Sequence, residues 1–154
     1  MSVNQKKVAV LLGSKNDMDY IEGAKEMLER FKIPYEVLVM SAHRTIDKVV
    51  EFSKGAEENG FGVIIACAGM AAHLPGVIAA KTLLPVIGVP LPTSDIRGMD
   101  ALLAIVQMPS GVPVATMAIG KSGVKNAAIL SAQILSLNDE KLRARLKEYK
   151  ESLG

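Results

Sequence analysis

Residues 41–45, Ser-Ala-His-Arg-Thr, place a histidine beside an arginine in a chain that has only two histidines. Arg44 offers a planar, permanent positive charge that suits a phosphate or a carboxylate. His43 can gain or lose a proton near neutral pH, as a general acid or base must. The alternative is a half-exposed histidine and a solvated arginine, with Thr45 capping a following helix. Position within the fold has to decide between the two interpretations.

A second segment, Gly13-Ser-Lys-Asn-Asp17, could hold an anion and a sugar. The glycine permits a tight turn, and free backbone N–H groups at the start of a helix would attract a phosphate. Ser14 adds a hydroxyl donor, and Asp17 could accept hydrogen bonds from ribose hydroxyls. The alternative is plain helix capping, because Ser14-x-x-Asp17 matches a weak capping box.

A third segment, residues 68–76, consists mostly of small residues around His73. Small residues such as those at Ala68-Gly69 let a ligand approach the backbone closely. His73 could face that ligand or could be a structural histidine. The preceding Cys67 is expected to be a buried strand residue, since nothing nearby marks it as an activated thiolate.

Other kinds of site are excluded by spacing. The run Gly120-Lys-Ser lacks the glycine of a phosphate-binding Walker loop, because Ala115 stands five positions earlier. No Gly-x-Gly-x-x-Gly fingerprint occurs, and no cluster of His, Cys and carboxylates has metal-ligand spacing. A receiver domain would need an acidic residue where Ala68-Gly69 stand. We therefore expect neither a metal nor a cofactor. Two prolines and a glycine within residues 90–98 indicate a shaped loop.

The elements that position these residues can be recognised by hydrophobic pattern. Five apolar runs are expected to be strands, and their continuity, without alternation, is typical of parallel strands buried on both faces. The runs are residues 7–12, 35–40, 62–67, 85–89 and 113–119. Helical patterns lie between them, so the chain is predicted to be an α/β protein, a three-layer doubly wound parallel sheet. Ligands bind such sheets outside the carboxyl ends of the strands, which is where the three segments fall.

Composition narrows the class of protein. The length of 154 residues favours a single α/β domain over residues 1–154. A net charge of +2 and 4% aromatic residues make nucleic acid an improbable partner. The single cysteine suits a reducing compartment, and the N-terminal apolar run is too short for a signal or membrane segment. We expect a cytoplasmic protein with no membrane contact.

Apolar helices indicate self-association. The segments 71–83 and 98–108 are apolar nearly all round, so something beyond the sheet must cover them. We expect another subunit, hence a homo-oligomer. The charged segment 139–153 carries a narrow stripe: Leu142, Leu146, Tyr149 and Leu153. This C-terminal helix could lie along its own domain or form an arm on a neighbouring subunit. We expect residues 139–153 to pack on a neighbouring subunit.

Together, the three strand ends indicate phosphate binding, ribose binding and one proton-transfer histidine. They also resemble the motifs of a known family: residues 13–17, GSKND, look like its GSxSD element, and residues 41–45 and 71–76 look like its SAHRT and AAHLPG elements. The chain resembles the class I N5-carboxyaminoimidazole ribonucleotide mutases of purine biosynthesis over about residues 7–150. Three ordered motifs with the family's separations are far more specific than any one alone.

The resemblance implies a flavodoxin-like fold, an octamer and an isomerase acting on a small ribonucleotide without a cofactor. The carboxylate would move from the exocyclic nitrogen to C4 of an aminoimidazole ribonucleotide, through release and recapture of carbon dioxide. His43 would be the general acid and base. Ser14 and Arg44 would hold the phosphate, Asp17 the ribose, and His73 with Ala68 and Gly69 the carboxylate and carbon dioxide. Ser41 is counted with the substrate-binding residues.

The chain departs from the family pattern at Cys67, at Met70 and in the loop Leu91 to Arg97, which differs from the commoner VQS-containing version. Cys67 and Met70 replace two glycines of the commoner GAGGAAHLPG, and Met70 is expected to crowd the loop or shift its backbone. Two other functions stay open. One is the related carbon dioxide-dependent carboxylase, whose members more often have lysine where Arg44 stands. The other is a non-catalytic nucleotide-binding module.

Overall fold

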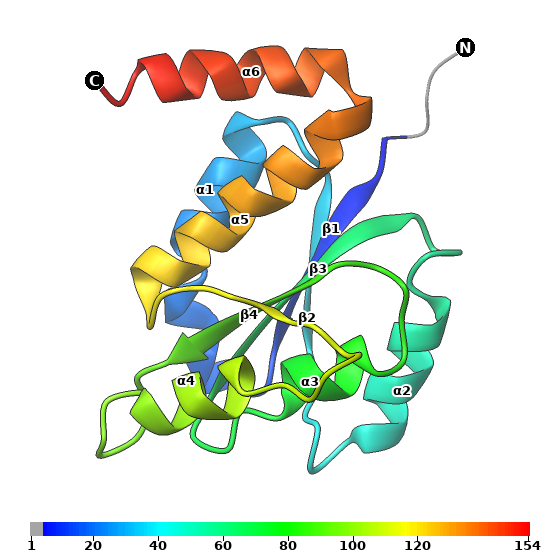
Figure 1. Ribbon diagram of the computed structural model, residues 1–154, viewed down its shortest axis with the longest axis vertical. Helices are drawn as coiled ribbons and strands as arrows, with labels where there is room; N and C mark the ends of the chain where they lie inside the picture. The colour runs from blue at the N-terminus through cyan, green and yellow to red at the C-terminus, as the bar shows by residue number, and fades with distance from the viewer. Residues whose placement is uncertain (1–4) are drawn as a thin grey trace.

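The computed structural model describes residues 5–154 and contains one sheet of five parallel strands. The strands pair in the order β2-β1-β3-β4-β5, all in parallel register (Figure 1). They are β1 (Lys7–Leu12), β2 (Tyr35–Val39), β3 (Phe61–Gly69), β4 (Val86–Leu91) and β5 (Ala115–Thr116). This is the flavodoxin-like arrangement, so the predicted doubly wound α/β fold is confirmed.

Helices cover both faces of the sheet. The α1 helix (Glu22–Arg30) and the α5 helix (Lys121–Leu135) pack together on one face, with α6 (Glu140–Glu151) above them. The other face carries α2 (Ile46–Gly55), α3 (Leu74–Ala79) and α4 (Met99–Val106). Two short 3₁₀ helices, η1 (Lys15–Tyr20) and η2 (Ser136–Asn138), complete the described part of the chain. Residues 8–12 of β1 are fully buried between the two layers.

The edge strands differ from the predicted pattern. Every residue of β2 is half-buried or exposed, so the expectation of burial on both faces is wrong for this strand. It lies at the edge of the sheet and pairs only with β1. The strand predicted over 113–119 shrinks to the two residues of β5, because it is the other edge and only Ala115 and Thr116 stay in register with β4.

Two helices are shorter than their apolar patterns indicated. The helical pattern between the first two predicted strands divides into the 3₁₀ helix η1 and then the helix α1. The segment predicted over 71–83 forms a helix only at Leu74–Ala79, because residues 70–73 form the loop that leaves β3. A fully apolar run therefore contains both a loop and a helix, which periodicity alone cannot separate.

The stripe of α6 packs within its own chain. Leu142, Leu146 and Tyr149 are buried, and the Tyr149 ring meets the edge of the Phe31 ring at a centroid distance of 5.4 Å. Arg145 donates a hydrogen bond to the Phe31 carbonyl oxygen at 3.1 Å. Figure 1 shows α6 lying across the ends of α1 and α5. These three residues of the stripe thus follow the first of the two alternatives, whereas Leu153, which lies beyond the end of α6, is exposed. A contact between the C-terminal segment and a neighbouring subunit stays a prediction.

Candidate functional site

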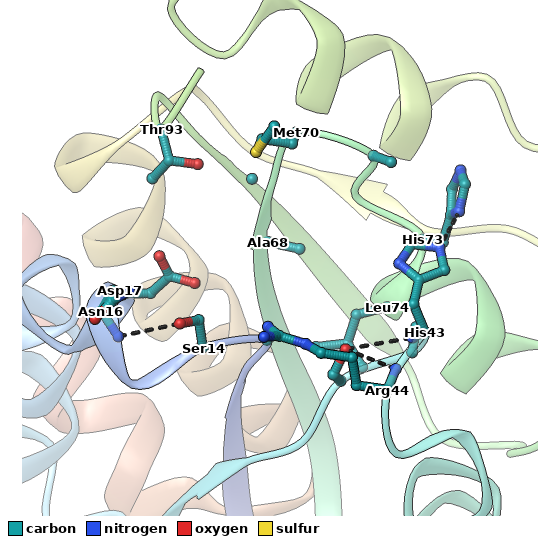
Figure 2. A pocket seen from close by; sticks show the side chains of 15 residues that line it. Ser14, Asn16, Asp17, His43, Arg44, Ala68, Met70, His73, Leu74 and Thr93 are labelled. Carbon is teal, nitrogen blue, oxygen red and sulfur yellow. Dashed lines mark hydrogen bonds between the residues drawn. The ribbon is translucent and has the colours of Figure 1, made fainter.

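A cavity of about 640 Å³ lies at the carboxyl ends of β1, β2, β3 and β4 (Figure 2). This is the crevice at the topological switch point, between the strands that lead outward in opposite directions. All eight residues predicted for the site line it. They are Ser14, Asp17, Ser41, His43, Arg44, Ala68, Gly69 and His73. The other lining residues are Gly13, Asn16, Ala42, Met70, Ala71, Leu74 and Thr93.

The turn at residues 41–45 is held by two of its own side chains. Thr45 Oγ1 accepts a hydrogen bond from the Ser41 N–H at 2.8 Å and donates one to the Ser41 carbonyl oxygen at 3.2 Å. Ser41 Oγ accepts from the N–H groups of His43 at 3.3 Å and Arg44 at 3.1 Å. Thr45 stands at the N-cap position of α2 but makes no side-chain cap hydrogen bond, so the capping part of the alternative is wrong, although His43 and Arg44 are both exposed. The hydroxyl of Ser41 uses its lone pairs within the turn and keeps its proton for a ligand.

Ser14 is arranged in a similar way. Its hydroxyl oxygen accepts from the N–H of Asn16 at 3.2 Å, as a helix cap does. The capping alternative therefore holds, and a hydroxyl that accepts through oxygen can still donate its proton into the cavity. The helix that follows is the six-residue 3₁₀ helix η1. Its free amides are a weaker anion site than the predicted α-helix would provide, so the side chains carry the argument for phosphate binding.

Asp17 is the buried carboxyl of the site, with 7% of its surface exposed. Burial raises the pKa of this carboxyl above its ordinary value, and a backbone hydrogen bond to Ser14 opposes the rise. A half-desolvated carboxylate gains more than a solvated one from a neutral hydroxyl donor. Asp17 is thus suited to bind hydroxyl groups of a sugar.

The two histidines of the chain contact one another across the cavity wall. His43 Nε2 lies 2.8 Å from His73 Nδ1, and the rings meet edge to face at a centroid distance of 4.9 Å. Figure 2 marks this contact between the two rings. A hydrogen bond at this distance needs one proton between the two nitrogens, and either ring can supply it. His73 therefore orients the ring of His43, a role that the sequence did not predict.

Arg44 keeps its charge free for a ligand. In residues 5–154 the ion pairs found are Lys7 with Glu36 and Lys25 with Glu22, and neither lies at the cavity. The Arg44 side chain is exposed, and Figure 2 draws it near Ser14 at the floor of the site. A guanidinium without an ion-pair partner, in a cavity that two serines also line, is a suitable receptor for a phosphate dianion.

Gly69 and Thr93 explain how two strand ends come together. A Cβ atom added at Gly69 would stand 1.8 Å from Thr93 Oγ1, so only glycine lets the loop after β4 approach β3 this closely. Thr93 was not predicted as a site residue. Its position directly after β4, within the loop recognised at residues 90–98, was the available signal.

Met70 and Asn16 were also missed as cavity residues. Asn16 lies inside the Gly13–Asp17 segment and could have been included with it. Met70 was expected to crowd the loop or shift its backbone. Its backbone has a φ of 53°, the left-handed conformation that suits glycine, and the side chain projects at the rim of the cavity with 59% of its surface exposed.

Cys67 directly precedes the cavity residues Ala68 and Gly69 in β3. Its side chain is fully buried in β3, as the sequence predicted. Burial, with a smaller contribution from the charge of Asp17, raises the pKa of the thiol to about 12. A thiol in this state is a poor nucleophile, so Cys67 packs the core and takes no part in the chemistry.

Residues 5–154 contain neither a candidate metal-binding cluster nor a candidate membrane-spanning helix. No group of three or more His, Cys, Asp or Glu side chains is arranged to hold a metal ion in that part of the chain. Within the same residues, none of the helices is both long and apolar enough to cross a bilayer.

Comparison with known proteins was made with the whole chain. The family model described as AIRC, AIR carboxylase, matches residues 7–154. The N5-carboxyaminoimidazole ribonucleotide mutase of Escherichia coli (strain K12) is 52% identical over 149 residues, which cover 97% of this chain and 88% of that protein. The mutase of Saccharolobus solfataricus is 53% identical over 147 residues, which cover 96% of this chain and 92% of that protein.

A solved structure has the same fold. The crystal structure of PurE from Treponema denticola superimposes with a TM-score of 0.86 at 32% sequence identity, and the match covers 96% of this chain and 90% of that one. The resemblance stated from the three motifs is confirmed by these comparisons.

Proposed function

The chain belongs to the AIR carboxylase family, and we propose that it is an isomerase that converts N5-carboxyaminoimidazole ribonucleotide into 4-carboxy-5-aminoimidazole ribonucleotide. The observation that carries the proposal is that Ser14, Asp17, Arg44 and both histidines line the same cavity. Relatives named for this activity are about half identical to the chain over nearly its full length.

The phosphate of the substrate would lie between Ser14, Ser41 and Arg44. Each serine oxygen already accepts from a backbone N–H, so each hydroxyl proton is free to donate to a phosphate oxygen. The guanidinium supplies the charge. The ribose hydroxyls would donate to the buried carboxyl of Asp17. Anchoring these groups fixes the imidazole ring and lets remote binding energy orient the reacting atoms.

One histidine can serve both proton transfers. In the first step His43 gives a proton to the carbamate nitrogen, the nitrogen–carbon bond breaks with its electron pair left on nitrogen, and carbon dioxide is released. In the second step C4 of the ring attacks carbon dioxide, and the C4 proton passes to His43. The proton gained equals the proton lost, so the enzyme ends in its starting state and no cofactor is consumed.

The contact between the histidines suits this sequence. His73 holds the His43 ring before substrate arrives, because one proton lies between Nε2 of His43 and Nδ1 of His73. A substrate that receives the Nε2 proton would take the place of His73 at that nitrogen. His73 would then stand beside the carboxylate, with Ala68 and Gly69, in the role implied by the family resemblance.

The carboxylase reaction is the second candidate, because the family as a whole is described as a carboxylase. In that reaction free aminoimidazole ribonucleotide and carbon dioxide combine directly. Arg44 and the relatives named as mutases favour the isomerase. Assays of the purified protein with each substrate in turn, under low and high bicarbonate, distinguish the two. Faster turnover of the free ribonucleotide with bicarbonate would reject the isomerase proposal.

The test of the residues uses two variants and a control. His43→Asn should keep the melting temperature and ribonucleotide binding and lose at least about 100-fold in kcat, the usual scale of a general acid–base contribution. Arg44→Ala should weaken ribonucleotide affinity in calorimetry. Lys48→Ala removes an exposed cation of α2 that does not line the cavity, and it should leave both quantities unchanged. Near-normal turnover by His43→Asn would sink the assignment. Binding without turnover by the unaltered protein would instead favour a nucleotide-binding module.

A further inference from the structure

Met70 has a backbone conformation that L-residues rarely adopt, and no helix end explains it. Three non-glycine residues of the described chain have positive φ: Lys32, Met70 and Arg97. Lys32 ends α1 in the usual manner, with the next N–H bonded back to the Leu28 carbonyl oxygen at 2.9 Å. Met70 follows a strand, between Gly69 and Ala71, where a glycine would adopt φ of 53° without strain.

The side chain of Met70 does not offset the cost of this strained backbone by packing in the core. It is 59% exposed, and neither hydrophobic core of the described residues includes it. It lines the cavity instead, and Figure 2 places it beside Thr93, on the far side of Ala68 from Ser14 and Arg44 in that view. Strain kept for a side chain at the rim of a cavity points to a function there.

The position of Met70 defines what that function could be. The end of the cavity proposed for the phosphate is polar, with Ser14, Ser41 and Arg44, whereas the end at Ala68 and Gly69 carries small groups and no charged side chain, with the Thr93 hydroxyl beside Gly69. Methionine is flexible and apolar, and can cover a small uncharged molecule without offering it a hydrogen bond. Carbon dioxide is such a molecule.

We propose that the Met70 side chain covers the carboxylate end of the cavity and retains carbon dioxide between the two half-reactions. This inference rests on the proposed isomerase function. When the nitrogen–carbon bond breaks, carbon dioxide is held by no covalent bond. It either reacts with C4 or escapes, and escape leaves aminoimidazole ribonucleotide and free carbon dioxide as balanced products. An apolar cover lowers escape and excludes water from the same space.

The experiment measures the fate of the carboxyl carbon. N5-carboxyaminoimidazole ribonucleotide with a ¹³C carboxyl group is given to each enzyme in excess unlabelled bicarbonate, and a reaction without enzyme corrects for spontaneous decarboxylation. The unaltered protein should keep most of the label in the 4-carboxy product. Met70→Ala and Met70→Gly should both lose label and release several-fold more aminoimidazole ribonucleotide. Met70→Leu, which restores apolar bulk, should stay close to the unaltered protein.

The three variants separate the side chain from the backbone. Alanine removes the cover and keeps an unfavourable φ, whereas glycine removes both the cover and the strain, so Met70→Gly should melt no lower than the unaltered protein. Equal label retention in all four proteins would overturn the inference while leaving the isomerase function intact. Loss of label in Met70→Gly alone would also overturn it, because backbone mobility would then be the cause. An unaltered protein that does not isomerise the substrate would reject the proposed function, and this inference with it.

Discussion

Ser14 and Ser41 share one arrangement, although they lie on different strand ends. Each hydroxyl oxygen accepts from backbone N–H groups two or three residues ahead, so the backbone fixes the oxygen and leaves the proton directed elsewhere. The same hydrogen bond that stabilises a local turn therefore prepares a donor for the ligand. At this scale the capping and binding interpretations are compatible, because a hydroxyl has both a donor and acceptors.

Asp17 gives a pH-dependent prediction at the residue scale. Burial raises the pKa of its carboxyl, so the folded state binds the proton more tightly than the unfolded state does. Its contribution to stability is then greatest below its ordinary pKa and is lost as the pH rises through the raised value. Asp17→Asn should therefore exceed the unaltered protein in free energy of unfolding at pH 7, with a smaller difference at pH 4.5.

Urea denaturation at the two pH values checks this, with the exposed neighbour Asp19 changed to Asn as the control. A difference between Asp17→Asn and the unaltered protein that is equal at both pH values would contradict the argument.

The sequence identified the eight cavity residues because one rule of parallel sheets places ligands after the strands. It could not identify the contact between His43 and His73. That contact joins the ends of β2 and β3, which are separated in the sheet by β1, and it depends on how far two loops lean toward each other. Thr93 was missed for the same reason, since its place at the cavity depends on the shape of its loop.

At the scale of elements, the ends of β3 and β4 can approach each other because Gly69 has no side chain. Gly69 must lack a Cβ because Thr93 Oγ1 occupies its position. Gly69→Ala should force the loop after β4 outward and lower the free energy of unfolding by about 1–3 kcal/mol, the usual effect of overpacking. It should also weaken ribonucleotide binding.

Gly13→Ala is the matched control for stability. Gly13 lines the same cavity, but a Cβ built there meets nothing within 4 Å. The melting temperature of Gly13→Ala should stay close to that of the unaltered protein. The double variant Gly69→Ala/Thr93→Gly, in which the clashing side chain is removed, should also melt close to the unaltered protein. Equal melting temperatures for Gly69→Ala and the unaltered protein would show that the loop moves without cost.

The elements themselves were predicted well where they are buried on both sides. The boundaries of β1 match its apolar run, because a fully buried strand is apolar throughout its length. The edge strands and the shortened α3 were predicted less well, because apolar residues there face loops, the cavity or solvent.

At the scale of the whole molecule, an apolar stripe on α4 has no cover within the described chain. Met99, Leu103 and Val106 are 50%, 52% and 45% exposed, and their spacing puts them on one face of α4, while Ile96 in the turn before the helix is 61% exposed. A second copy of the chain is the expected partner, and the family resemblance implies an octamer. Light scattering should give a mass several times that of one chain.

Leu103→Glu should reduce that mass, because it places a charge in the middle of the stripe. Lys54→Glu changes an exposed residue of α2 that lies outside the stripe and outside both apolar segments, so the mass of this variant should not change. A monomer before any substitution would contradict the expected assembly.

Because Cys67 is buried, chemical modification of its thiol can be used to measure unfolding of the protein. The chain has one thiol, it lies in the middle strand of the sheet, and no surface cysteine competes with it for a labelling reagent. Local fraying at the cavity rim leaves β3 covered, so a thiol reagent should modify the chain only when the sheet itself opens. The rate of modification therefore measures the opening of the core, and a bound ribonucleotide should slow that rate by a factor that rises exponentially with the free energy of stabilisation it adds.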